Sequence, residues 1–244
     1  MSKTDFPYYN GQPVEIAPMG WLAILVSVGV ALGLLITLPF PNFPLNLLPA
    51  IAYTGLPLLT LALVTRGHHT ALFARFGLKQ LGQALGFGLL TIAVSLGVGL
   101  ILLQFTAMTA NPSVAALSHM TGIDMVLFML RTFIQLIGEE LMTILPLLAV
   151  LWLCLRKFNT SRRIGLVIAV LVSTVWFAAV HLPTYNWNLL QCLGGIGAAR
   201  LVLTTAFLVT RNLWVSAGAH IANDWTEFLA PMLLGGHLPV DTAG

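Results

Sequence analysis

The stretch IDMVLFMLRTFIQLIGEELMTILPLLAVLWLCL, residues 123–155, decides the fold of this chain. It is almost unbroken apolar sequence, yet two adjacent glutamates, Glu139 and Glu140, stand in its middle. A carboxylate at membrane depth costs about 2.5–3.5 kcal/mol on insertion scales, so an acid there marks a functional site by default. We therefore expect a membrane protein that carries out chemistry inside the bilayer.

The composition of the whole chain supports a membrane protein. Hydrophobic residues make up 58% and charged residues only 8% of the 244 residues. A soluble domain averages about 45–50% apolar and about 25% charged residues. So few charges could not cover the surface of a soluble protein, and we expect the lipid bilayer to be the main partner.

A membrane-spanning helix needs about 20 mostly apolar residues. Candidate spans cover residues 20–38, 46–65, 81–105, 123–155, 164–181, 189–209 and 213–234. The sequence thus predicts an all-α, polytopic transmembrane helix bundle of about seven, at most eight, spans. We expect a polar N-terminal tail over 1–19, a single transmembrane domain over 20–236 and a short C-terminal tail over 237–244.

The basic residues predict the orientation of the chain. They cluster in three connections, at 66–79, 156–163 and 211, whereas 39–45, 107–122 and 182–188 carry no Lys or Arg. The positive-inside rule then places the basic connections and the N-terminus in the cytoplasm. We expect a bacterial cytoplasmic membrane protein. The net charge of +3 reflects this topology, so no nucleic acid partner is predicted.

Polar residues recur at helical spacing inside the predicted spans. Arg131, Gln135 and Glu139 are four residues apart and share a helix face, while Glu140 points about 100° away. In the last span His220 and Asp224 are also four apart, so both side chains can reach one small volume.

These residues carry a resemblance to a known family. The order Glu139-Glu140, Phe177-x-x-x-His181, a Gly-rich apolar helix, Thr210-Arg211-Asn212-Leu213-Trp214 and His220-x-x-x-Asp224 resembles the CPBP family of intramembrane proteases. That family includes type II CAAX prenyl proteases and bacterial proteins tied to bacteriocin processing and self-immunity. The likeness covers roughly residues 133–228.

The resemblance implies an intramembrane (metallo)protease of the CAAX prenyl protease 2-like type. Glu139 would be the base that activates water, His181 would position that water or bind a metal, and His220 with Asp224 would complete the site. Glu140 belongs to the same catalytic set. Supporting roles are expected for Phe177, Asn223 and Arg200.

A metal ion is one of two mechanistic options. Two histidines and a carboxylate form a recognised catalytic zinc set, so Glu139, His181 and His220 are candidate ligands for Zn²⁺ or another divalent metal. The other option is a water activated by Glu and His alone. The chain contains no HExxH helix, which excludes the usual soluble metalloprotease arrangement.

One position departs from the family motif EExxxR. Ile144 occupies the place of the arginine, so Glu140 lacks its expected partner. Because an unpaired buried carboxylate is costly, we expect Arg200, or failing that Arg131, to pair with Glu140.

Two other functions compete with an endopeptidase acting on a membrane-associated peptide or protein. A proton-coupled transporter also places acids and histidines at membrane depth. A non-catalytic bacteriocin-immunity or scaffold protein would keep the fold without activity.

The predicted depths of the site residues in the membrane do not agree. Counted from the cytoplasmic ends at 1.5 Å per residue, Glu139 and His181 lie ~25 Å deep but His220 only ~13 Å.

Overall fold

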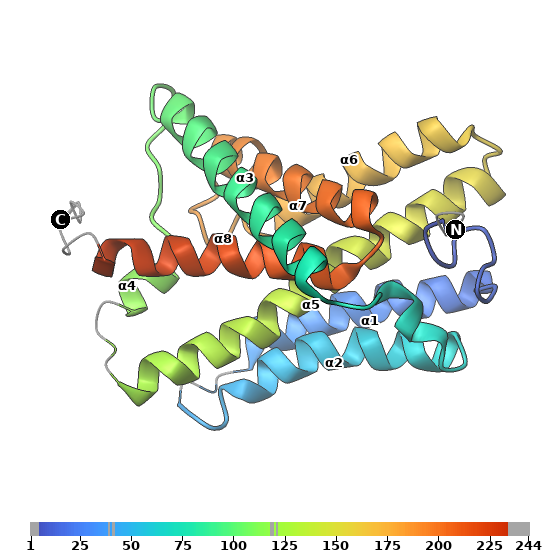
Figure 1. Ribbon diagram of the computed structural model, residues 1–244, viewed down its shortest axis with the longest axis horizontal. Helices are drawn as coiled ribbons and strands as arrows, with labels where there is room; N and C mark the ends of the chain where they lie inside the picture. Colours follow the sequence, from blue (N-terminus) through green and yellow to red (C-terminus); the bar gives the residue numbers. More distant parts are fainter. Residues whose placement is uncertain (1–4, 39, 41, 118–119, 121, 234–244) are drawn as a thin grey trace.

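The computed structural model describes residues 5–38, 40, 42–117, 120 and 122–233, and the regular secondary structure in this part is entirely helical, with no strand. The predicted all-α class is therefore confirmed. Figure 1 shows the helices crossing one another in one elongated bundle, with α1 and α2 side by side along one edge. The predicted tail at 237–244 lies outside the described residues.

The long helices follow the predicted spans closely at their ends. They are α1 (Pro18–Thr37), α2 (Leu47–Val64), α3 (Leu78–Leu102), α5 (Ile123–Arg156), α6 (Arg162–Val180), α7 (Gly197–Thr210) and α8 (Leu213–Leu233). Three short elements lie between them: the 3₁₀ helix η1 (His68–Leu72), α4 (Pro112–Leu117) and the π-helix η2 (Leu190–Ile196), which continues into α7.

Six described helices, with η2 and α7 taken as one, are long and apolar enough to cross a membrane. About seven spans were expected, and the seventh, α8, is not among these six. This helix has the length, but Asn223, Asp224 and Glu227 make it too polar.

The N-terminal segment was expected to be a polar tail, but part of it packs into the fold. Phe6, Tyr8 and Tyr9 are almost fully buried, and Tyr8 donates a hydrogen bond to the carbonyl of His68 (2.7 Å). Asp5 forms an ion pair with Arg162 (2.7 Å). Burial alone would raise the pKa of Asp5, but hydrogen bonds from Tyr9 and Arg162 outweigh it and hold the pKa below its usual value.

Helix α5 is the centre of the bundle and by far the most buried of the six candidate spans. It continues through Pro146 as a single helix of 34 residues. Helix α2 fixes its position: the Thr54 hydroxyl donates to the Ile134 carbonyl (2.6 Å), and the Tyr53 hydroxyl donates to the sulfur of Met142 (3.0 Å). Gly138 makes this close approach possible, since a Cβ there would lie 2.6 Å from the Tyr53 ring.

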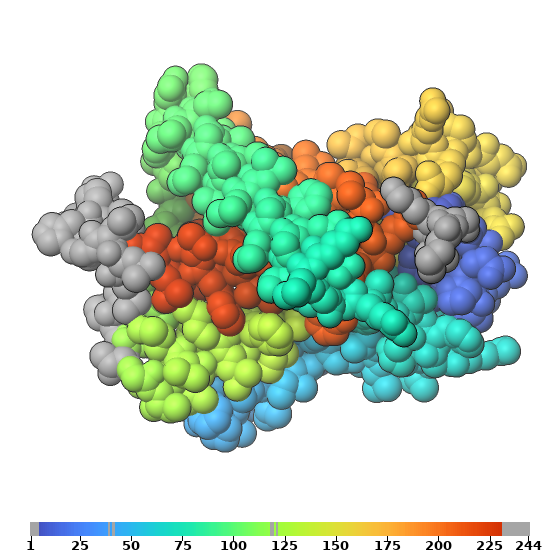
Figure 2. Space-filling view, viewed as in Figure 1, coloured from blue at the N-terminus to red at the C-terminus, as the bar shows by residue number. Residues whose placement is uncertain are grey.

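Helix α8 lies between α3 and the first half of α5, as the space-filling view also shows (Figure 2). Trp225 donates its indole hydrogen to the Thr132 hydroxyl on α5 (3.2 Å). At the start of α8, the buried Asn212 side chain accepts from the amide of Trp214 and also from that of Ala74 (3.1 and 3.2 Å). The first contact holds α8 against α5, where both helices carry acidic residues, and the Asn212 contacts hold the start of α8 against the segment that precedes α3.

Candidate active site

Glu140 and Arg200 form a fully buried ion pair between α5 and α7. The guanidinium donates two hydrogen bonds, from Nη1 to Oε1 (2.6 Å) and from Nη2 to Oε2 (3.1 Å). This two-pronged geometry is the strongest form of an arginine–carboxylate contact. The expected partner of Glu140 is thus Arg200, and the position of the motif arginine is filled by the buried, apolar Ile144.

Phe177 supports this pair from α6. The Arg200 guanidinium lies over the Phe177 ring, 5.1 Å from its centroid. The same ring packs against the imidazoles of His181 and His220, at centroid distances of 4.6 and 6.0 Å. One aromatic side chain therefore holds the arginine and both histidines in a common layer.

His220 connects three carboxylates. Its Nδ1 lies 2.9 Å from Glu140 Oε1, and its Nε2 lies 3.8 Å from Glu139 Oε2 and 3.6 Å from Asp224 Oδ1. Because an ionised carboxylate only accepts, Nδ1 donates to Glu140. Nε2 faces two carboxylate oxygens, which attract an N–H group and repel a nitrogen lone pair. This geometry therefore favours a hydrogen on Nε2 as well as on Nδ1, which is the imidazolium form of the ring.

The sequence places Asp224 beside His220, but the hydrogen bond that orients the imidazole is the one to Glu140. The i, i+4 spacing does bring Asp224 to the ring, but at 3.6 Å from the opposite nitrogen. Asp224 is itself held by a hydrogen bond from the neighbouring Asn223 amide (3.0 Å).

Glu139 lies on the open side of this cluster. Its Oε1 accepts a hydrogen bond from the Gln135 amide (3.0 Å), which leaves Oε2 directed toward His220. Gln135 was known from the sequence to share the face of Glu139 but was not counted among the site residues. Its i, i+4 spacing was the signal that could have identified it.

His181 lies at the C-terminus of α6. Its Nδ1 is 2.7 Å from the Phe177 carbonyl, and since a carbonyl only accepts, Nδ1 carries the hydrogen and Nε2 of a neutral ring holds its lone pair. The Phe177 ring lies between His181 and His220 and contacts both imidazoles. The fold thus brings together the candidate residues from α5, α6, α7 and α8.

The candidate metal ligands are not gathered into a ready ligand set in this arrangement. No group of three His, Cys, Asp or Glu side chains among the described residues is arranged to hold an ion. Nδ1 of both histidines is engaged, with the Phe177 carbonyl and with Glu140, so Nε2 of each ring is the nitrogen that would bind a metal. Because no complete ligand set is formed among the described residues, we assign no step to a metal ion.

Comparison with known families places this cluster in context. The family model described as type II CAAX prenyl endopeptidase, Rce1-like, matches residues 120–226. This confirms the family resemblance. The matched CAAX-protease region contains every residue of the cluster, from Gln135 on α5 to Asp224 on α8. No curated protein and no solved structure matches the chain.

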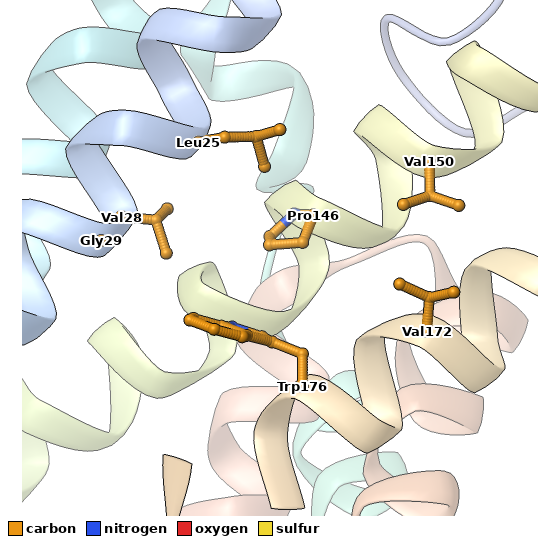
Figure 3. A pocket seen from close by; sticks show the side chains of 7 residues that line it. All are labelled: Leu25, Val28, Gly29, Pro146, Val150, Val172 and Trp176. Carbon is orange, nitrogen blue, oxygen red and sulfur yellow. The ribbon is translucent and has the colours of Figure 1, made fainter. Parts of the chain in front are cut away.

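An apolar groove lies between α1, α5 and α6 (Figure 3). It has a volume of about 310 Å³ and is lined by Leu25, Val28, Gly29, Pro146, Val150, Val172 and Trp176. This lining has no carboxylate, imidazole or guanidinium, so the groove is separate from the polar cluster.

Proposed function

We propose that this integral membrane protein is an endopeptidase that hydrolyses a peptide bond of a membrane-associated peptide or protein. The observation that carries the proposal is the facing pair of Glu139 Oε2 and His220 Nε2, 3.8 Å apart in a buried site. The match to CAAX prenyl endopeptidases supports the reaction class. Several apolar helices support a location in the membrane.

In the proposed mechanism Glu139 takes a proton from a water molecule, whose oxygen attacks the carbonyl carbon of the peptide bond. The Nε2–H of His220 stabilises the negative charge that develops on the carbonyl oxygen. His181, through Nε2, accepts a hydrogen bond from the attacking water. The carbon–nitrogen bond then breaks, and Glu139 returns its proton to the leaving amine.

The ion pair between Glu140 and Arg200 serves this mechanism indirectly. Glu140 fixes the imidazole of His220 through Nδ1, and Arg200 keeps Glu140 ionised and immobile. Preorganised donors of this kind are more effective in a buried site than in water, because no reorganisation is needed during the reaction. Phe177 adds a rigid wall to the same assembly.

The decisive experiment is a peptide-cleavage assay with purified protein in detergent, comparing wild type with Glu139→Gln. This change keeps the shape of the side chain and removes the base, so we expect kcat to fall by about 10²- to 10⁴-fold. Glu15→Gln, which alters an exposed glutamate, is the matched control and should retain full activity. Equal activity of Glu139→Gln and wild type would contradict the proposal.

We further propose that the protein lies in a bacterial cytoplasmic membrane with its N-terminus inside. The three basic connections support this orientation, because each contacts the N-terminal segment: Tyr8 bonds to His68, Asp5 to Arg162, and the Arg211 guanidinium lies 5.6 Å from the Phe6 ring. They therefore lie at one end of the bundle, as the positive-inside rule requires.

A further inference from the structure

One segment of the chain bridges the two elements that carry the histidines of the site. It covers residues 106–117, follows the end of α3 and includes α4, and we call it the strap. Figure 1 shows it running from the end of α3 to the side of α8. Residues 107–111 of the strap have no regular secondary structure. Its two ends are held very differently.

The first part of the strap is fastened to the turn between α6 and η2. The Asn188 amide donates to the Thr106 hydroxyl (3.0 Å) and to the Ala107 carbonyl (2.8 Å). The buried Gln191 side chain donates to the Thr109 carbonyl (2.8 Å) and accepts from the Thr109 amide (2.9 Å). These paired hydrogen bonds fix this end of the strap to the turn that follows His181.

The second part of the strap is held more weakly, against α8. The Asn111 amide donates to Glu227 Oε1 over 3.5 Å, which is a long hydrogen bond in an exposed position. In the short helix α4, Leu117 is the buried residue. Glu227 follows Asp224 by three residues and so lies on the same side of α8. The strap therefore reaches α8 one turn beyond the site.

The site itself is nearly closed when the strap is in this position. The side chains of Glu139 and His220 are only 11% and 6% exposed. Asp224 is 19% exposed and His181 is half-buried, so the remaining access lies at the edge that these two residues form. An extended peptide cannot reach Glu139 Oε2 unless an element at this edge moves.

Given the proposed endopeptidase function, on which this inference rests, we propose that the strap is the gate of the active site. It admits the peptide by parting from α8 while its first part stays fastened to the turn before η2. The long helices around the site are joined by buried bonds, from His220 to Glu140 and from Arg200 to Glu140. Opening the strap breaks one exposed hydrogen bond and uncovers one buried leucine. Lids that open and close in this way control access to many active sites.

A cross-link between the strap and α8 tests the gate. Asn111→Cys and Glu227→Cys are combined and joined with a reducible bis-methanethiosulfonate reagent, and peptide cleavage is measured before and after reduction. The native Cys154 and Cys192 are buried and are common to all variants. We expect the cross-linked protein to lose most of its activity and reduction to restore it. Undiminished cleavage by the cross-linked protein would show that the strap need not open.

A cross-link at the fastened end is the matched control. Thr106→Cys and Asn188→Cys replace two side chains that already contact each other (3.0 Å). Because this end does not move when the gate opens, the same reagent should leave cleavage unchanged here. Equal losses of activity from both cross-links would contradict a gate that opens at α8.

Labelling of Leu117→Cys measures the opening without any cleavage. Leu117 is fully buried, so a maleimide can react with Leu117→Cys only while the strap is open. Adding Asn111→Ala removes the hydrogen bond to Glu227 and should raise the labelling rate about 2- to 10-fold, as expected for the loss of one hydrogen bond. Asn42→Ala, which alters an exposed asparagine elsewhere, should leave the rate unchanged. A rate that Asn111→Ala does not alter would contradict the gate.

The two measurements separate the gate from the function. If wild type and the reduced double variant cleave no peptide, the endopeptidase function fails, and labelling of Leu117→Cys still decides whether the strap opens. If they cleave and the cross-link to α8 does not slow them, the function stands and the gate is wrong. Should the double variant not fold, the labelling rate alone decides.

Discussion

At the scale of single residues, the pairing of Glu140 with Arg200 shows how a motif can change while its electrostatics are kept. The resembling family carries an arginine one turn after the glutamates, where this chain has Ile144. Here the guanidinium comes from α7 and takes both oxygens of Glu140. The charge on the carboxylate is balanced by a different helix, so the loss of the motif arginine does not leave Glu140 unpaired.

Replacing Arg200 alone should strongly destabilise the protein. Arg200→Met would leave Glu140 buried and uncompensated, which typically costs about 3–5 kcal/mol. The double variant Glu140→Gln/Arg200→Met should recover part of this loss, because no unpaired charge remains. Thermal unfolding in detergent measures both, with Arg75→Met on an exposed residue as the control. Wild-type stability of Arg200→Met would show that the pair contributes little.

Replacing Asp224 should have a milder effect than replacing Glu139. Asp224 faces His220 Nε2 at 3.6 Å and supports the charge of the ring, whereas Glu140 makes the hydrogen bond that orients it. We expect Asp224→Asn to lower kcat/KM by about 10- to 100-fold, as supporting groups commonly do. Steady-state kinetics beside Glu139→Gln gives the comparison. If Asp224→Ala is fully active, Asp224 has no role in the site.

The sequence was sufficient to predict which residues gather, but not how they bond. Helical spacing places His220 next to Asp224 and Gln135 next to Glu139, because both pairs are i, i+4 on one helix. The bond from His220 to Glu140 depends on how α8 is rotated and shifted against α5. Spacing within one helix contains no information on that placement.

At the scale of elements, the length of the apolar stretches in the sequence predicted the long helices, because a membrane-spanning helix needs about 20 apolar residues to cross the bilayer. The shorter elements were not predicted. Helix α4 and the 3₁₀ helix η1 are too short for a periodic pattern, and the π-helix η2 differs from an α-helix only in its hydrogen bonding. The packing of Phe6 and Tyr8 depends on contacts distant in the sequence.

The contact between α2 and α5 should depend on Gly138. A Cβ at this position would lie 2.6 Å from the Tyr53 ring and 2.7 Å from the Thr54 hydroxyl. We therefore expect Gly138→Ala to destabilise the protein by about 1–3 kcal/mol and to lower activity, because Glu139 is the next residue. Thermal unfolding and the cleavage assay measure these effects.

A matched glycine separates packing from helix propensity. Gly86 in α3 has nothing within 4 Å of an added Cβ, so Gly86→Ala should be as stable as wild type or more stable. If Gly138→Ala were equally well tolerated, close packing against Tyr53 would not be what positions α5.

At the scale of the whole molecule, the predicted depths of the site residues disagreed because every span was treated as a straight crossing of the membrane. In the structure His220 bonds directly to Glu140, so no difference in level separates α8 from α5. Among the long helices that the structure describes, α8 alone is too polar to be a candidate span. Its polar residues include those of the site, so its depth cannot be counted as for a straight crossing of the membrane.

The orientation of the whole molecule gives the last prediction. The connections that carry Arg66, Arg156 and Arg211 meet around the N-terminal segment, and Lys79 begins α3 at this same end. Gln104 follows the other end of α3, about 37 Å away for a helix of 25 residues. In the proposed orientation, which follows the positive-inside rule, we expect Lys79 in the cytoplasm and Gln104 outside. In cells, a membrane-impermeant maleimide should therefore label Gln104→Cys directly and Lys79→Cys only after permeabilisation. The native Cys154 and Cys192 are buried and should give little background. The reverse labelling pattern would mean that the N-terminus lies outside and that the proposed orientation is wrong.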